Sequence, residues 1–107
     1  MTNDTPRTAE QLGSAAFLAK ALADENRLRI LAVIGGGKKT VTRIVEEVGI
    51  SQPLVSHHLK ELKRALLVRV ERNGPFVLYE LADGETMAII TALHELATRL
   101  LAQRTTF

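Results

Sequence analysis

The sequence contains no cysteine, and it has no long hydrophobic run. Without cysteine, the chain cannot form a disulfide framework, a thiolate zinc site or a thiol redox switch. No apolar run approaches the roughly 20 residues that a membrane-spanning helix needs. The polar residues 1–7 also lack the apolar segment of a signal peptide. These absences predict a cytoplasmic protein.

The composition of the chain is that of one small globular domain. Its length is 107 residues and 46% of them are hydrophobic, which is enough to form a core. We expect residues 1–8 to form a flexible tail and residues 9–107 to form the domain. The net charge of +2 is too small to indicate a partner, but residues 51–72 hold five basic and only two acidic side chains. The most basic part of the chain therefore lies in its middle.

Four stretches have apolar residues at helical spacing. The predicted helices cover residues 9–23, residues 24 or 25 to 34, residues 40–48 and residues 52–66. The three glycines 35–37 end the second helix because glycine destabilises a helix interior and readily takes the left-handed conformation of a helix end. Gly49 ends the third helix, and Ser51 can cap the fourth. A short turn that contains glycine thus joins two helices, which is the helix-turn-helix arrangement.

After residue 67 the apolar residues change from a helical period to a period of two. Residues 68–71 and 76–81 alternate as strands do, and Asn73-Gly74-Pro75 forms a turn between them. A last helix follows over residues 85–103. The predicted order is ααααββα, a mainly α fold with one β-hairpin, and it is the order of a winged helix-turn-helix domain.

The helix over residues 52–66 has two unlike sides. Its apolar stripe, which predicts a buried face, consists of Val55, Leu59, Leu62 and Leu66. The opposite face is polar and basic. An α-helix fits the major groove of DNA, where its first residues reach base edges and basic residues farther along hold phosphates. A basic hairpin tip can grip phosphate or enter a minor groove.

These rules divide the predicted DNA contacts into two groups. The expected contacts with bases are Gln52, Ser56 and His57, and the expected contacts with the backbone are Lys60, Lys63 and Arg64. The other predicted DNA contacts, on the same helix and on the hairpin, are Pro53, His58, Arg69, Arg72 and Asn73.

The three histidines allow different roles. His57 and His58 point about 100° apart on the helix, so they cannot bind one metal ion from the same face. His58 lies at the margin of the apolar stripe, where it is either a phosphate contact or a packed core residue. His94 could form half of a nickel or zinc site shared between two subunits, with carboxylates such as Asp4 or Glu10. We expect no bound cofactor, with this metal site as the alternative.

Other functional classes fit these residues less well. A winged helix can serve protein–protein contact, and its basic face would then be incidental. An enzyme is not expected because Ser56 and His57 are adjacent but point apart, and no G-x-S-x-G elbow or carboxylate pair is apparent. The glycines before Lys38-Lys39-Thr40 lack the spacing of a phosphate-binding P-loop. The order of the elements favours DNA binding.

Several segments of the sequence resemble the ArsR/SmtB family of bacterial winged-helix repressors. They cover residues 22–31, 49–62, 67–74 and 79–81, and the Ser-His-His-Leu segment in the second of them is a specific marker. The resemblance implies a dimeric repressor that binds an operator with inverted-repeat symmetry and is released by an effector. It also implies that the first and last helices join the two subunits. The apolar residues expected in that interface are Leu12, Phe17, Leu18, Ile89, Leu93, Leu96 and Leu100.

The sequence departs from this family at positions that sense metals in other members. Thr40 and Thr42 stand where arsenic, cadmium or lead sensors carry a Cys-x-Cys pair. Later zinc ligands of the last helix fall near Leu96 and Arg99, and neither an apolar side chain nor a cation binds a divalent metal. The effector is therefore unidentified and is not sensed through cysteine. Leu66 replaces a common glycine, and because leucine is strained in a left-handed conformation we expect the helix to end in another way.

Overall fold

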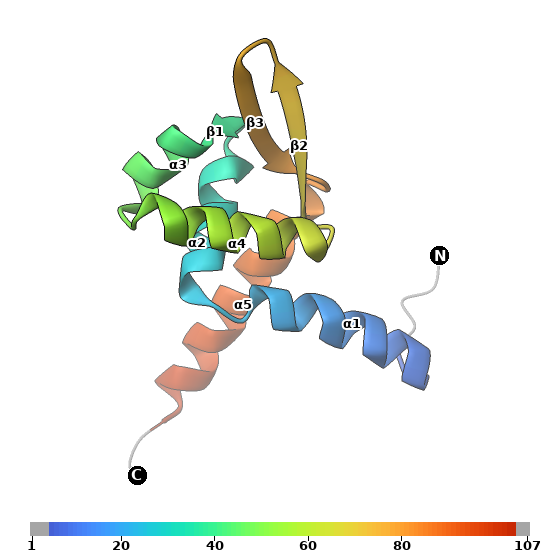
Figure 1. The fold of residues 1–107 in the computed structure, drawn as a ribbon. Coiled ribbons are helices and arrows are strands. Elements are labelled where there is room, and N and C mark those ends of the chain that lie inside the picture. The colour runs from blue at the N-terminus through green and yellow to red at the C-terminus, as the bar shows by residue number, and fades with distance from the viewer. Residues whose placement is uncertain (1–4, 105–107) are drawn as a thin grey trace.

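The computed structural model describes residues 5–104, which form five helices and one three-stranded antiparallel sheet (Figure 1). The elements in chain order are α1 (Ala9–Leu22), α2 (Glu25–Gly35), β1 (Lys39–Thr40), α3 (Val41–Val48), α4 (Gln52–Arg64), β2 (Val68–Asn73), β3 (Phe76–Leu81) and α5 (Glu85–Ala102). The predicted winged helix-turn-helix fold is confirmed. Strand β1 is an addition to the predicted order, because two residues are too few to show a period.

The turn between α3 and α4 is held at both of its ends. Gly49 has a φ of 77°, so α3 ends in the left-handed conformation that favours glycine. The side chain of Arg29 donates a hydrogen bond of 2.7 Å to the carbonyl of Val48, which lies at the helix end and accepts no bond within the helix. On the other side the hydroxyl of Ser51 accepts from the backbone N–H of Leu54 at 3.3 Å and caps α4. These contacts set the direction in which α4 leaves the turn.

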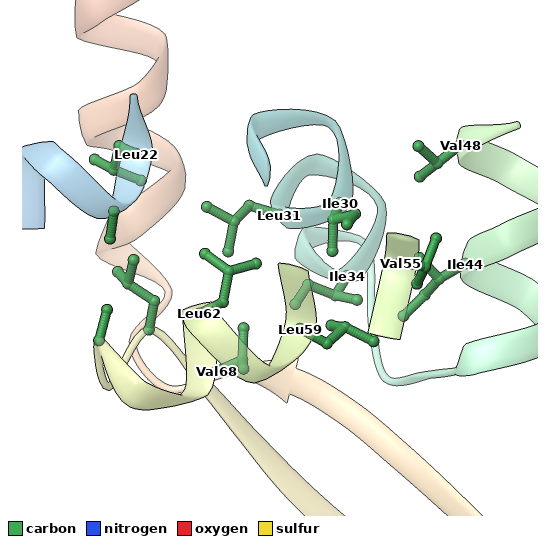
Figure 2. Close-up of a cluster of buried hydrophobic side chains, with 13 residues drawn as sticks. Leu22, Ile30, Leu31, Ile34, Ile44, Val48, Val55, Leu59, Leu62 and Val68 are labelled. Atoms are coloured by element: carbon green, nitrogen blue, oxygen red, sulfur yellow. The ribbon is translucent and has the colours of Figure 1, made fainter. Parts of the chain in front are cut away.

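The apolar stripe of α4 lies at the centre of the core. Val55, Leu59 and Leu62 are at most 1% exposed and pack against α2 and α3 (Figure 2). The residues of α2 and α3 in this cluster are Ile30, Leu31, Ile34, Ile44 and Val48. Burying each such side chain contributes roughly 1.5–3 kcal/mol to stability. The opposite face of α4 is therefore directed away from the domain.

The structure at the end of α4 contradicts two predictions about Leu66. Leu66 has a φ of 65°, so the helix does end in a left-handed residue, and the expectation of another ending is wrong. The N–H of Leu67 donates to the carbonyl of Leu62, and the N–H of Leu66 donates to that of Lys63, both at 3.0 Å. This pair of bonds is the Schellman motif, and it turns Leu67 into the core beside Leu62. Leu66 is 76% exposed instead, so it does not belong to the buried stripe.

The hairpin of β2 and β3 forms the wing, which extends away from α4 (Figure 1). Asn73 pairs with Phe76, and the two-residue loop between them begins with Gly74 at a φ of 62°. Strand β1 adds to the other edge of β3, with Lys39 opposite Tyr79. The sheet order β1-β3-β2 thus ties the wing to the segment that precedes α3.

Helices α1 and α5 project from the rest of the domain (Figure 1). Several of their apolar side chains are exposed. Only Ala21 and Leu22 of α1, and only Thr86 of α5, are buried. The seven predicted interface residues, Leu12, Phe17, Leu18, Ile89, Leu93, Leu96 and Leu100, are all between 38% and 56% exposed. No helix within residues 5–104 is long and apolar enough to cross a membrane.

The predicted domain boundary stays a prediction. Helix α1 begins at Ala9, directly after Thr8, whose hydroxyl accepts a hydrogen bond from the N–H of Gln11 at 3.0 Å. Half of the predicted tail, residues 1–4, lies outside the residues that the structure describes.

Candidate DNA-binding surface

The outer face of α4 is exposed along its whole length. Seven of the predicted DNA contacts are exposed on this face: Gln52, Pro53, Ser56, His57, Lys60, Lys63 and Arg64. Within residues 5–104, neither Lys60 nor Lys63 has a carboxylate partner, whereas Arg64 lies 2.9 Å from Glu61. The structure therefore brings these side chains to one face that carries net positive charge.

His58 is the one predicted contact of α4 that the structure removes from this face. It is 5% exposed, so its assignment as a DNA contact is wrong and it is a packed core residue. Arg27 Nε donates to His58 Nδ1 at 3.3 Å, and Asp24 lies 3.9 Å from Nε2. Burial lowers the pKa of His58, and the nearby Asp24 carboxylate opposes this only in part. The 3.6-residue period alone left this position open because His58 adjoins the stripe.

The wing carries a network of paired charges at its base. Arg69 lies 2.9 Å from Glu80, and Lys38 lies 2.7 Å from Glu71 and 3.5 Å from Glu80. The hydrogen bond from Arg69 lowers the pKa of Glu80, and the hydrogen bond to Glu71 raises the pKa of Lys38. The positive charge of Arg69 is therefore already balanced within the wing.

The tip of the wing differs from its base. Arg72 and Asn73 are both exposed, and no carboxylate in the described part of the chain pairs with Arg72. Of the two predicted wing cations, Arg72 is thus the one whose charge is available to a ligand.

Sequence reasoning missed two exposed apolar side chains on these two elements. Leu54 in the first turn of α4 is 37% exposed, and Phe76 beside the hairpin turn is 59% exposed. Their exposure could have been predicted from their positions in the sequence, because Leu54 falls outside the apolar stripe of α4 and Phe76 directly follows the hairpin turn. An apolar side chain in the major groove, such as Leu54 on α4, can contact a thymine methyl group, whereas one in the minor groove can insert between base steps.

His94 lies on the exposed face of α5, where the hydroxyl of Thr98 donates to its backbone carbonyl at 2.9 Å. In the part of the chain that the structure describes, no group of three or more His, Asp or Glu side chains could hold a metal ion. Asp4, one of the suggested ligands, lies outside the described residues. A metal site shared between subunits stays a prediction.

Comparison with known proteins agrees with this geometry. The sequence pattern described as "Bacterial regulatory protein, arsR family" matches residues 24–70. An HTH-type transcriptional regulator of Methanocaldococcus jannaschii is 35% identical over 88 residues, which cover 81% of this chain and 99% of that protein. The HTH-type transcriptional repressor SmtB of Mycobacterium tuberculosis is 39% identical over 89 residues, which cover 83% of this chain and 66% of that protein.

A solved structure extends the similarity to the fold. The homodimeric winged helix-turn-helix DNA-binding domain of a possible ArsR-family regulator from Mycobacterium bovis superimposes with a TM-score of 0.76 at 27% identity. The match covers 100% of this chain and 99% of that one. The matched segment from Asp24 to Val70 contains the helix-turn-helix and the start of the wing. With its sequence and its fold in agreement, the chain belongs to the ArsR family of bacterial regulatory proteins and is a DNA-binding transcriptional regulator.

Proposed function

We propose that the protein represses transcription as a homodimer that binds an operator of inverted-repeat symmetry and is released by an effector. The observation that carries this proposal is the division of α4 into a buried apolar side and an exposed basic side. An exposed helix of this kind enters the major groove, and two copies related by a two-fold axis read two half-sites. The cytoplasm, where such a regulator meets the chromosome, is the compartment that we propose.

The position of each residue along α4 determines the DNA contact that we assign to it. Gln52, Ser56 and His57 lie in the N-terminal half and are assigned to base edges, and Leu54 beside them is suited to a thymine methyl group. The cations of the C-terminal half, Lys60, Lys63 and Arg64, are assigned to phosphates, which position the protein without reading sequence. Arg72 and Asn73 at the wing tip are assigned to the neighbouring backbone or minor groove.

Titration of DNA from upstream of the protein's own gene tests the proposal. Fluorescence anisotropy at several salt concentrations should show tight binding whose logarithm falls steeply with the logarithm of salt concentration, because phosphate contacts release counterions. Binding that is absent, or that does not depend on salt, would instead favour a winged helix used for protein–protein contact.

Substitutions on α4 test which residues read bases. Lys60→Ala and Arg64→Ala should weaken binding to all sequences alike, whereas Ser56→Ala and His57→Ala should also reduce discrimination against mismatched operators. Each mismatched base pair in an operator typically costs about 1–3 kcal/mol of binding free energy. Arg99→Ala removes an exposed cation of α5 and is the matched control. If the Ser56 and His57 variants discriminate as the parent does, the assignment of the groove is wrong.

The effector should act without a thiolate, because the chain has no cysteine. Calorimetric titration of the metal-free protein with nickel and zinc tests the alternative of a metal sensor that uses His94. Binding tighter than micromolar that is abolished in His94→Ala would establish the metal sensor, and its absence would remove it.

A further inference from the structure

A hollow between α1, the start of α2 and the last turn of α4 contains three cations. Its volume is about 450 Å³, and its charged residues are Lys20, Arg27, Glu61 and Arg64. Phe17, Ala21 and Ala65 supply the apolar part of its wall. The single carboxylate in the wall, Glu61, pairs with Arg64 at 2.9 Å. The remaining excess is two positive charges on one concave surface.

Arg27 is the unusual member of this group. It is half-buried, and the nearby Asp24 carboxylate, whose pKa the charge of Arg27 helps to lower, lies beyond ion-pair distance of its guanidinium. Its two hydrogen-bond acceptors are both neutral: Nε donates to His58 Nδ1 at 3.3 Å, and Nη1 donates to the carbonyl of Ala21 at 3.4 Å. A charge that has lost part of its water needs a counter-charge, and charged side chains that are buried are normally paired.

The two neutral contacts also hold the guanidinium in one orientation. An arginine has five N–H donors in a planar fork, so the Nη2 side of Arg27 keeps donors available. Lys20, on the last turn of α1, is exposed and has no partner among residues 5–104. An oriented guanidinium, an ammonium and the second guanidinium of Arg64 together match an anionic group with several acceptor oxygens.

We propose that this hollow is a binding site for a phosphate group, held by Lys20, Arg27 and Arg64. Two sources share this chemistry: a phosphodiester of the DNA backbone beside the C-terminal half of α4, or the phosphoryl group of a small effector. The first source rests on the proposed function, because α4 then lies on DNA. Through its hydrogen bond to His58, Arg27 connects the site to the core side of α4.

Titration of the DNA-free protein with inorganic phosphate, at constant ionic strength, tests the site by itself. We expect saturable binding by calorimetry and a saturable shift of the Nε–H resonance of Arg27. Lys20→Gln should weaken that binding by about tenfold, the effect of removing one charge-assisted hydrogen bond. Arg43→Gln removes an exposed cation of α3 outside the hollow and should change the affinity for phosphate by less than about twofold.

Arg27→Lys provides a second variant that keeps the charge and removes the fork. It should weaken phosphate binding while the protein remains folded, as judged by circular dichroism. If the Arg27 resonance does not shift, or if Lys20→Gln and Arg43→Gln weaken binding equally, the proposal is overturned. Failure of the parent protein to bind operator would contradict the proposed function and leave this test of the hollow intact.

Operator titrations distinguish the two sources. If the DNA backbone supplies the phosphate, Lys20→Gln should lower the salt slope by about 0.9 for each phosphate that the variant no longer binds. If a small effector supplies it, the salt slope should be unchanged in Lys20→Gln. Inorganic phosphate should then change the operator affinity of the variant only at a concentration about tenfold higher than for the parent.

Discussion

Leu66 shows how a single residue can carry strain at the end of a functional helix. Its φ of 65° is required by the two hydrogen bonds that close α4 and direct Leu67 into the core. For a residue with a Cβ atom this conformation costs roughly 1–2 kcal/mol. The exposed side chain of Leu66 recovers little of that cost within one protomer.

Leu66→Gly should therefore raise the free energy of unfolding by about 1 kcal/mol, because glycine takes a positive φ without the clash of a Cβ atom. Urea unfolding at one fixed protein concentration measures it, since association also affects stability. Leu66→Ala keeps the Cβ atom and should show no such gain. A loss of stability in both variants would contradict this prediction and show that the leucine side chain itself stabilises the protein.

His58 makes the stability of the fold depend on pH. Its surroundings are Asp24, Arg27 and His57, and burial keeps its folded-state pKa below the ordinary value of 6.5. The unfolded chain binds the proton more readily, so the contribution of neutral His58 is complete above about pH 6.5 and decreases as the pH falls toward the folded-state pKa. Protonation of Nδ1 would also break the hydrogen bond from Arg27.

The free energy of unfolding should accordingly be lower at about pH 5.5 than at about pH 7.5. His58→Gln retains an acceptor for Arg27 and cannot titrate, so its stability should change much less over this range. The lowered pKa of Asp24, caused first by the backbone N–H of Arg27, places its own contribution at more acidic pH. Equal pH dependence in the parent and in His58→Gln would contradict this role of His58.

The wing carries paired charges at its base and, at its tip, the cation Arg72, which is available to contact DNA. Lys38 joins Glu71 of β2 to Glu80 of β3, and Arg69 joins Glu80 from the neighbouring strand. These pairs are exposed, so each contributes little to stability. They determine which charge of the wing is available to a ligand. Glu80 balances the charge of Arg69, whereas no carboxylate in the described part of the chain balances that of Arg72.

Arg72→Ala should therefore lower the salt slope of operator binding by about 0.9 per phosphate contact, or about 1.8 for a dimer that carries the change twice. Arg69→Ala should change the slope much less, because it removes a cation that is already paired. Anisotropy titrations over a range of salt concentrations measure both variants side by side. A larger change for Arg69→Ala than for Arg72→Ala would refute this division of the wing charges.

At the scale of the whole molecule, α1 and α5 leave an apolar surface that one protomer does not cover. Four leucine and isoleucine side chains of α5 repeat at helical spacing on one side of that helix, and all are 45% to 56% exposed: Ile89, Leu93, Leu96 and Leu100. Contiguous exposed apolar surface of this kind marks an interface. A second copy of the chain is the occupant that the proposed function requires.

Leu93→Glu should convert the dimer to a monomer, because it places a charge in the apolar stripe of α5. Thr98→Glu places the same charge on the opposite side of α5 and should leave the dimer intact. Analytical ultracentrifugation measures both. A monomeric parent protein, or a dimeric Leu93→Glu variant, would remove α5 from the interface.

Local pattern was enough to predict most of the elements and much of the site. The period of 3.6 placed Val55, Leu59 and Leu62 on one side of α4, and the structure buries all three. Capping at Ser51 and the helix end at Gly49 were likewise predictable, because capping side chains and glycine act on their own neighbours. The outward direction of Lys60 and Arg64 then followed from the burial of the opposite stripe.

The order of the elements and the two-sided character of α4 could thus be predicted from local pattern, since both depend on contacts a few residues apart. Four features could be seen only in the folded chain: the burial of His58, the exposed left-handed Leu66, the pairing of Arg69 with Glu80, and the hollow around Arg27. The contacts of His58, Arg69 and the hollow depend on side chains that arrive from another element, such as Arg27 of α2 against His58 of α4. Leu66 is left-handed because the local bonds that close α4 direct Leu67 into the core. The spacing of apolar residues along one helix does not show which side chains of other elements that helix will contact.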